Sequence, residues 1–211
     1  MSHKAIFLDK DGTLVVDVPY NVDPRRIELA PGVATGLKRL SEAGFKLVVV
    51  SNQSGVAHGL FGEEALRGVM LRLTELLSEH DVRLDGFYYC PHHPQGKVAE
   101  YVRACGCRKP MPGLIERAAR DLQIDVGRSW MIGDILDDVE AGHRAGCRSV
   151  LIDNGNETRW LMNELRRPDY RAADMNAAAQ WILLAAENDE DEPVVTGCDV
   201  ASTLRVPSNL R

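Results

Sequence analysis

The stretch AIFLDKDGTLV at residues 5–15 places four apolar residues directly before two aspartates and a glycine. An unbroken apolar run of this length is typical of a strand that is buried on both faces of a sheet. The acids Asp9 and Asp11 are two positions apart, so we expect them to project to the same side, with Lys10 pointing away. Gly12 permits a tight exit from the strand. The stretch therefore predicts a buried first strand that ends in two carboxylates facing one pocket.

Further apolar runs end at a polar residue or a turn, at Leu47–Val50, Trp130–Ile132 and Val150–Ile152. Segments with helical spacing lie between them, at Val33–Ala43, Glu63–Glu79 and Leu114–Leu122. Because strands and helices alternate, we expect an α/β fold, a Rossmann-like three-layer sandwich with a mainly parallel sheet. Sheets of this kind bind ligands at the carboxyl ends of their strands. The polar residues that end these runs therefore lie where chemistry is expected.

The composition is that of an ordinary globular protein: 45% of the 211 residues are hydrophobic and 27% are charged. It excludes a chain that is mostly disordered or mostly membrane-spanning. The net charge is −6, but five of the acids fall in one six-residue run at 187–192. The remainder is nearly neutral and has no basic block, so we expect no nucleic-acid partner.

The N-terminal apolar run is too short for a secretory signal, and nowhere do 18 apolar residues stand together. We therefore expect a cytoplasmic protein with no membrane partner, and we expect a monomer. The length suggests a single domain, which we assign to residues 1–186. The acidic segment at 187–211 has no clear periodicity, and we expect it to be a mobile tail.

Residues 86–110 contain three prolines and three glycines, which favours an inserted loop rather than a sheet element. In this segment Cys90-x-His92 is followed after twelve residues by Cys105-x-Cys107. Three thiolates and one imidazole can close a tetrahedral, structural Zn²⁺ site. The sequence therefore predicts a zinc loop at about 88–109, with His93 as a competing ligand. The alternative is that the cysteines are small buried hydrophobic residues.

The two carboxylates after the first strand also suggest a magnesium site. The side chain of Asp9, the main-chain carbonyl of Asp11 and the side chain of Asp134, which follows a later strand, form a set of hard oxygen ligands that suits Mg²⁺. The alternative is that the first two acids only form the turn and cap a helix. The short motif alone does not decide between these possibilities.

Four motifs occur in a fixed order: Asp9–Thr13 after the first apolar run, Ser51 after the next, Lys109 before a helix, and Gly133-Asp134 with Asp138 after a later run. This order resembles the four motifs of the haloacid dehalogenase superfamily. Longer matches at Ser51–Gly59, Tyr89–Gly96 and Cys105–Pro110 are similar to its D-glycero-D-manno-heptose 1,7-bisphosphate 7-phosphatases. The resemblance covers about residues 4–186 and implies a fold with no large cap domain.

The resemblance implies a role for each catalytic group. It implies that Asp9 attacks phosphorus and forms an aspartyl-phosphate, and that the Asp11 side chain is the general acid and base. Ser51 and Lys109 would stabilise charge on the phosphoryl oxygens. Asp138 would hold the second shell of the Mg²⁺ or pair with Lys109, although ordinary helix capping is an equal alternative for this residue.

The resemblance also implies contacts to the substrate, a small sugar phosphate. The candidate residues are Thr13, Asn52, Gln53, Gly55, His58 and Arg108. Thr13 would help to orient Asp11. Arg108 is the candidate for the non-reacting phosphate, because a guanidinium can bind phosphate in a bidentate fork. The alternative for Arg108 is a solvated surface charge. His58 stands where the family often carries arginine. The resemblance favours His92 over His93 as the zinc ligand.

The implied activity is Mg²⁺-dependent removal of the C7 phosphate from D-glycero-D-manno-heptose 1,7-bisphosphate, in the biosynthesis of nucleotide-activated heptose for an envelope lipopolysaccharide. Histidinol-phosphate phosphatase is the nearest alternative, because its family shares the catalytic motifs and the cysteine-rich loop. A phospho-acceptor signalling domain also gathers acids, a hydroxyl and Lys-Pro around Mg²⁺. It would carry its acceptor on a middle strand, whereas the acid pair here follows the first strand.

Overall fold

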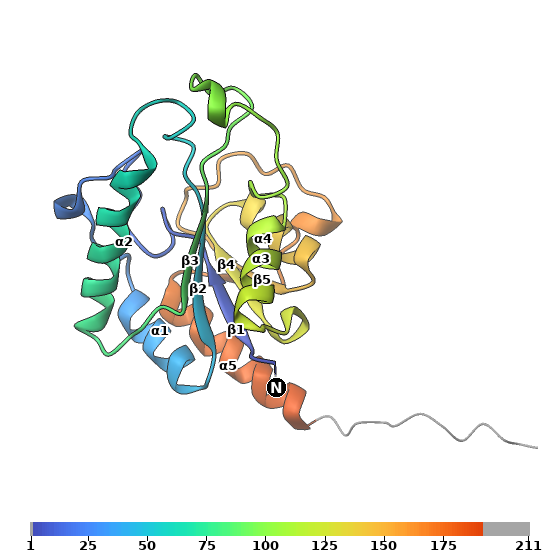
Figure 1. Ribbon diagram of the computed structural model, residues 1–211. Helices are drawn as coiled ribbons and strands as arrows, with labels where there is room; N and C mark the ends of the chain where they lie inside the picture. Colours follow the sequence, from blue (N-terminus) through green and yellow to red (C-terminus); the bar gives the residue numbers. More distant parts are fainter. Residues whose placement is uncertain (1, 192–211) are drawn as a thin grey trace, which may run out of the picture.

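A parallel sheet of six strands forms the centre of the molecule in the computed structural model, which describes residues 2–191 (Figure 1). The strands are β1 Ala5–Leu8, β2 Lys46–Asn52, β3 Gly86–Cys90, β4 Trp130–Gly133, β5 Arg148–Ile152 and β6 Tyr170–Ala172. The longer helices are α1 Val33–Glu42, α2 Glu63–Ser78, α3 Gly113–Leu122, α4 Leu136–Ala145 and α5 Met175–Asp191. Short 3₁₀ helices lie at η1 Pro24–Arg26, η2 Ala99–Tyr101, η3 Val126–Arg128 and η4 Glu164–Arg166. The predicted fold class is confirmed.

The strand order explains where a ligand can bind. The order is β3-β2-β1-β4-β5-β6, and every neighbouring pair is parallel. The order reverses between β1 and β4, and a crevice at the carboxyl ends of the strands opens at such a switch point. The residues that follow these two strands are therefore held side by side.

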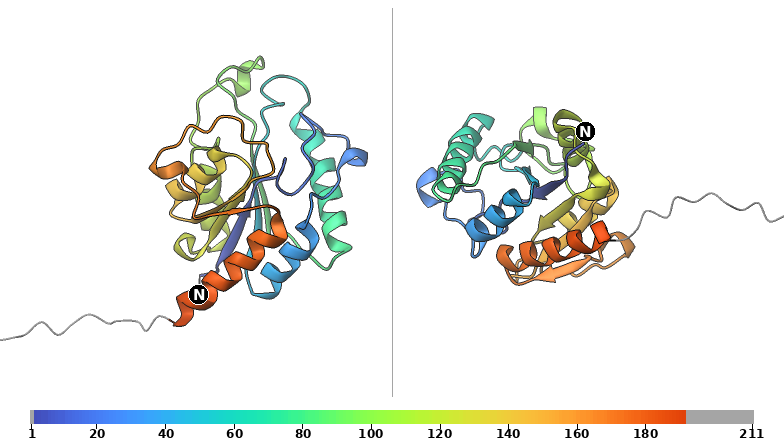
Figure 2. Two further views of the ribbon diagram at one scale, coloured as in Figure 1. Left: turned by 180° about the vertical axis from the view of Figure 1, so that it is seen from behind. Right: turned by 90° about the horizontal axis from the view of Figure 1, so that it is seen from below.

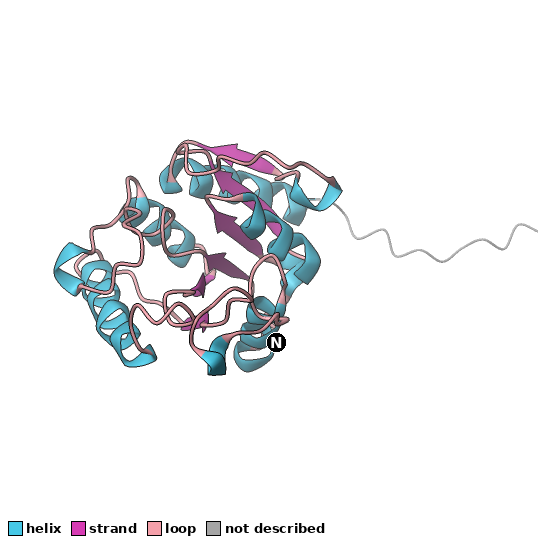
Figure 3. Ribbon diagram, turned by 90° about the horizontal axis from the view of Figure 1, so that it is seen from above, coloured by secondary structure: helices cyan, strands magenta, loops and turns pink. Residues whose placement is uncertain are grey.

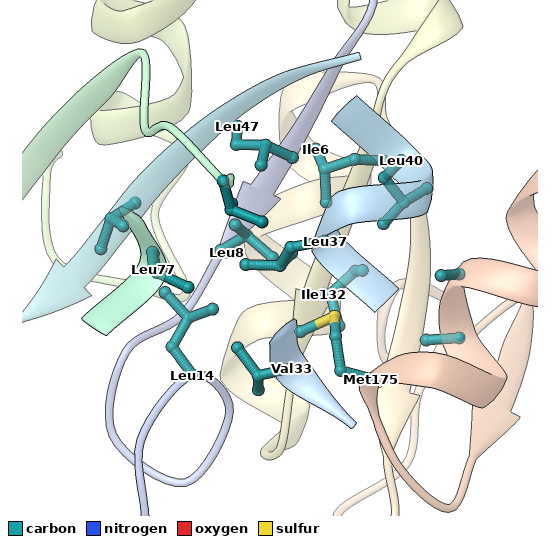
Figure 4. Packing of buried hydrophobic residues seen from close by; sticks show 14 of the residues in the cluster. Ile6, Leu8, Leu14, Val33, Leu37, Leu40, Leu47, Leu77, Ile132 and Met175 are labelled. Atoms are coloured by element: carbon teal, nitrogen blue, oxygen red, sulfur yellow. The ribbon is translucent and has the colours of Figure 1, made fainter. Parts of the chain in front are cut away.

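The apolar run of β1 is buried on both faces, as its lack of alternation predicts. Ala5–Leu8 have no exposed surface. Ile6 and Leu8 face the cluster formed with α1, α2 and α5, in which Leu37 is central (Figure 4). Phe7 faces the opposite cluster, formed with α3. Since successive residues of a strand point to opposite faces, this one short run packs against the helices on both sides of the sheet.

Helix α5 packs beside α1 against the sheet (Figure 2). Residues 187–191, which were predicted to begin the mobile tail, are the last residues of this helix. Residues 192–211 of the predicted tail lie outside the described residues. Between residues 2 and 191, no helix has both the length and the apolar character needed to cross a membrane.

The prediction that residues 86–110 contain no sheet element is wrong for its first five residues. Gly86–Cys90 form β3, which pairs with β2 from Val48 to Asn52 at the edge of the sheet. The run GFYYC is rich in aromatic residues that favour strands, but the prolines and glycines that follow obscured it. The zinc loop proper therefore begins at the end of a strand, and Cys90 is anchored by the sheet.

The long connections gather at one end of the sheet, which Figure 3 views from above. This is the end at which the parallel strands finish, and it carries the loops after β1, β2, β3 and β5. The candidate site lies there.

Candidate active site

The turn after β1 brings its acids to the switch point. The Lys10 carbonyl accepts hydrogen bonds from the backbone N–H groups of Leu14 at 2.9 Å and Val15 at 3.0 Å, so the chain curls back on itself. Gly12 has a φ of 81°, and a Cβ at this position would lie 2.1 Å from Asp134 Oδ2. Only glycine allows the turn to lie this close to the acid that follows β4.

Lys109 lies at the centre of the site. Its side chain is 2% exposed, and its Nζ pairs with the Asp9 carboxylate and with Asp138 Oδ1 at 2.6 Å. The same Nζ donates to the Val50 carbonyl at 2.9 Å. A buried ammonium needs counter-charges and acceptors of this kind. Three segments distant in sequence therefore converge on one amine.

The main chain of Lys109 is held by Asn52, which the sequence assigned to the substrate. The Asn52 Oδ1 accepts from the Lys109 N–H at 3.0 Å, and its Nδ2 donates to the Lys109 carbonyl at 3.1 Å. This side chain therefore positions the lysine with both ends of its amide.

Three carboxylates meet around this amine. Asp9, Asp134 and Asp138 each offer an oxygen, and these oxygens lie within 4.8 Å of one another. Asp134 is 5% exposed and Asp138 is fully buried. Lys109 pairs with both Asp9 and Asp138, so its single positive charge leaves two negative charges unbalanced when all three acids are ionised. A divalent cation is the kind of ligand that would balance this cluster.

The electrostatics of the cluster follow from burial and like charge. Burial raises the pKa of Asp9 to about 7 against the opposing charge of Lys109. Burial and the charge of Asp9 raise the pKa of Asp134 to about 6. Burial likewise raises the pKa of Asp138 to about 6. Burial alone would lower the pKa of Lys109, but the charges of Asp138 and Asp9 outweigh it and raise the value.

These residues fit a magnesium ion. Carboxylate and carbonyl oxygens are its preferred protein ligands. The Asp11 main-chain carbonyl accepts none of the hydrogen bonds formed within residues 2–191, so it is free to serve as a further ligand. Asp138 also accepts the Ile135 N–H at 3.3 Å, so it caps α4 in addition to pairing with Lys109.

Thr13 differs from its predicted role. Its hydroxyl donates to Asp134 Oδ1 at 3.2 Å, whereas orientation of Asp11 was expected. The curled turn buries Thr13 and directs it toward β4.

The prediction that Lys10 points away from the acids is also wrong. Lys10 is buried and its Nζ pairs with Asp11 Oδ1, because strand alternation ends where the turn begins. The Asp11 side chain, 34% exposed, also accepts from Gln53 Nε2 at 3.1 Å. The same Gln53 amide donates to Ser51 Oγ at 2.8 Å. Ser51 and Gln53 are buried, so the second strand supplies a fixed support for Asp11.

A pocket of about 260 Å³ opens beside Asp11. It is lined by Asp11, Asp17, Pro19, Tyr20, Asn21, Asn52, Gln53, Ser54 and Gly55. At Gly55 a Cβ would lie 2.2 Å from the Phe61 ring, so a close approach of the loop requires glycine. Most of the lining residues carry a polar side chain, which suits a ligand rich in hydroxyl groups.

The remaining substrate candidates lie beside the zinc loop. The His58 ring centroid is 4.8 Å from that of His93 and 6.2 Å from that of Tyr20. Burial, with the charges of Arg108 and His58, lowers the pKa of His93, so three basic groups are near one another. The buried Nη1 of Arg108 has no hydrogen-bond partner within residues 2–191.

The four predicted zinc ligands come together. The Cys90, Cys105 and Cys107 sulfurs lie 3.2–3.5 Å apart, and His92 Nδ1 is 3.6 Å from Cys90 and 3.4 Å from Cys107. A tetrahedral Zn²⁺ with Zn–S bonds of about 2.3 Å holds its sulfurs about 3.8 Å apart, so a small outward movement completes the shell. His93 instead accepts the Gln95 N–H with its Nδ1.

The sequence reasoning missed the residues that follow β5. Asn156 Nδ2 donates to Asp134 Oδ2 at 2.7 Å, and Asn154 Nδ2 donates to the Gly12 carbonyl at 2.7 Å. The signal was present, because the polar run DNGNE at residues 153–157 directly follows an apolar strand of the parallel sheet.

Known proteins are similar to this chain in sequence and in fold. A protein of Yersinia pestis named D-glycero-beta-D-manno-heptose-1,7-bisphosphate 7-phosphatase is 39% identical over 180 residues, which are 85% of this chain and 89% of that protein. The chain belongs to this family. A protein of the same name from Escherichia coli (strain K12) is 42% identical over 170 residues, which are 76% of this chain and 89% of that protein.

Two further comparisons agree with the family. A crystal structure of D,D-heptose 1.7-bisphosphate phosphatase from B. bronchiseptica, complexed with magnesium and phosphate, has a TM-score of 0.75 and 31% identity, and the match covers 87% of this chain and 99% of that chain. A HAD-hydrolase-like family model matches residues 106–178. The resemblance seen in the motifs is confirmed. The family favours a heptose bisphosphate phosphatase over histidinol-phosphate phosphatase and over a phospho-acceptor domain.

The excess charge predicts an unusual effect of Asp134→Asn on stability. The pKa of Asp134 is raised in the folded protein from 3.8 to about 6, so its contribution to stability falls as the pH rises through this window and is lost above it. At pH 7.5 the uncharged variant, without metal, should be more stable by about 1–3 kcal/mol. Mg²⁺ should raise the melting temperature of the parent and leave that of the variant unchanged.

Thermal melts in chelator and in Mg²⁺ test this prediction. Asp81→Asn is the control, because Asp81 forms an exposed pair with Lys38 and should change stability by less than about 1 kcal/mol. An Asp134→Asn protein that is less stable than the parent in chelator, or that Mg²⁺ still stabilises, would contradict the prediction.

Proposed function

We propose that this protein hydrolyses the C7 phosphate of D-glycero-β-D-manno-heptose 1,7-bisphosphate through an aspartyl-phosphate on Asp9. The observation that carries the proposal is the buried contact of Asp9, Lys109 and Asp138, with Asp134 beside it, at the switch point of the sheet. The names of the relatives supply the substrate.

Asp9 is the nucleophile in this proposal. One of its oxygens attacks phosphorus, and the bond from phosphorus to the sugar oxygen breaks. Asp11 gives its proton to the departing oxygen, then takes a proton from the water that attacks phosphorus and releases Asp9. Its position supports this role, because its partly exposed carboxyl group lies at the edge of the 260 Å³ pocket.

Lys109 and Ser51 support the reaction electrostatically. The Lys109 ammonium contacts Asp9 and is kept charged by its two carboxylate neighbours. A fixed cation and a fixed hydroxyl stabilise the phosphoryl oxygens without reorganisation during the reaction. Mg²⁺, held by Asp9, Asp134 and the Asp11 carbonyl, would neutralise charge on the phosphoryl group.

The zinc loop supports the proposal from a distance. Cys107 is a candidate zinc ligand and is followed directly by Arg108 and Lys109. A closed zinc shell can order a loop with few apolar contacts. The metal would therefore fix the residue that pairs with the nucleophile.

The second phosphate has a candidate site beside the pocket. Arg108, His58 and His93 place three basic groups near one another, and the buried Arg108 Nη1 has no partner among the described residues. A guanidinium binds phosphate with two parallel hydrogen bonds. A cytoplasmic location, a monomeric state and a single phosphatase domain over residues 1–186 remain predictions.

A panel of phosphate esters tests the activity. We expect Mg²⁺-dependent release of phosphate from the β anomer of the heptose bisphosphate, slower release from the α anomer and little from histidinol phosphate. Asp9→Asn should lower kcat by at least 10³-fold, because the nucleophile is lost. Asp81→Asn should retain the parental rate.

Two results would reject the proposal. One is histidinol phosphate as the best substrate, and the other is an Asp9→Asn variant with parental turnover. Single-phosphate release from the bisphosphate, monitored by phosphorus NMR, distinguishes the C7 from the C1 phosphate.

The zinc site is tested by metal analysis. The proposal predicts one zinc ion per chain, lost from Cys105→Ala together with a lower melting temperature. Cys147→Ala is the matched control, because Cys147 is buried outside the cluster and should leave the zinc content unchanged. Full zinc content in Cys105→Ala would refute the assignment.

A further inference from the structure

The segment Asn154–Glu157, which follows β5, contacts the acidic site at three successive points. Asn154 holds the Gly12 carbonyl at 2.7 Å, and Asn156 holds Asp134 Oδ2 at 2.7 Å. Glu157 Oε2 accepts the first backbone N–H of α4 at 2.8 Å. One short segment therefore binds the turn after β1, the acid after β4 and the start of the helix that follows it.

Asp134 is fixed from both of its oxygens. Oδ1 accepts the Thr13 hydroxyl at 3.2 Å, and Oδ2 accepts the Asn156 amide at 2.7 Å. Two donors on different oxygens set the rotation of the carboxylate plane. Each oxygen keeps a lone pair, because a carboxylate offers about four acceptor sites. The group is oriented and can still bind a metal.

An amide side chain at position 156 suits the contact with Asp134 for an electrostatic reason. Lys109 forms no close ion pair with Asp134, because its ammonium contacts Asp9 and Asp138. A further lysine or arginine would balance its charge but would also repel a divalent cation. The Asn156 amide stabilises the ionised carboxylate with a dipole and adds no net charge. It therefore supports the acid without competing with the metal.

The shape of this segment is set by a hydrogen bond within it and not by packing against the hydrophobic core. The Asn156 N–H donates to Asn154 Oδ1 at 3.2 Å, and Gly155 between them has a φ of 91°. Both asparagines are exposed. Substitution of either residue therefore opens no cavity in the core, and its effect reports on the contacts to the site.

We infer that Asn156 is a positioning residue for the divalent metal, which fixes the Asp134 carboxylate in its ligating orientation, and that Asn154 holds the facing turn. The inference rests on the proposed function, because it requires Mg²⁺ to bind at Asp9 and Asp134. It assigns to the segment after β5 a role that none of the four sequence motifs contains.

Calorimetric titration of the full chain with Mg²⁺ alone tests the inference without turnover. Loss of a hydrogen bond to a metal ligand costs about 10–100-fold in metal affinity, so Asn156→Ala should raise the Kd for Mg²⁺ by about tenfold or more. Asn154→Ala should raise it by a smaller factor. Asn163→Ala is the matched control: Asn163 caps η4 in the same connection and should leave the Kd within about twofold.

Kinetics separate positioning from general damage to the site. In Asn156→Ala the Mg²⁺ concentration for half-maximal activity should rise with the Kd, while kcat at saturating Mg²⁺ returns to within about threefold of the parent. An unchanged Kd in Asn156→Ala would overturn this inference but not the proposed function. A kcat that saturating Mg²⁺ does not restore would do the same. A parent protein that binds no Mg²⁺ would overturn the proposed function and this inference together.

Discussion

The site depends on one buried ammonium placed among three buried carboxylates. Lys109 pairs with Asp9 and Asp138, and Asp134 lies within reach of the same oxygens. One positive charge cannot balance three negative charges in a medium of low dielectric constant. Burial and mutual repulsion therefore raise the pKa values of the acids to about 6–7. The cluster costs stability until a divalent cation joins it.

The fold holds the charged residues of this cluster in place. The doubly wound order brings the ends of β1 and β4 together. The neighbouring strand β2 supplies the Val50 carbonyl, which accepts a hydrogen bond from Lys109 Nζ. The loop that supplies the lysine brings four zinc-type side chains together, and a metal ion bound there would anchor it. The two candidate metal sites would serve different purposes. The cysteine and histidine ligands would close the shell of a structural ion, whereas the oxygen ligands would leave positions open on an ion that takes part in the reaction.

The sequence predicted the parts of this arrangement that depend on local pattern. The unbroken run before Asp9 gave the bounds of β1, and the cysteine spacing gave the zinc-type ligands. It could not predict the contacts that the turn itself sets. Lys10 was expected to point away from Asp11 but pairs with it, and Thr13 was expected to orient Asp11 but donates to Asp134. Strand β3 was hidden by the prolines that follow it. Asn156 was missed because its partner lies 22 residues away and only the folded sheet brings them together.

Calorimetric titration with Mg²⁺ at pH 5.5 and pH 7.5, in buffers of different ionisation enthalpy, tests the central claim most directly. Raised carboxyl pKa values mean that the metal-free site holds protons below about pH 6–7, and Mg²⁺ binds only the ionised form. The account predicts an affinity at least about tenfold higher at pH 7.5 and release of about one to two protons per ion bound at pH 5.5. Equal affinities at the two pH values, with no proton release, would contradict it.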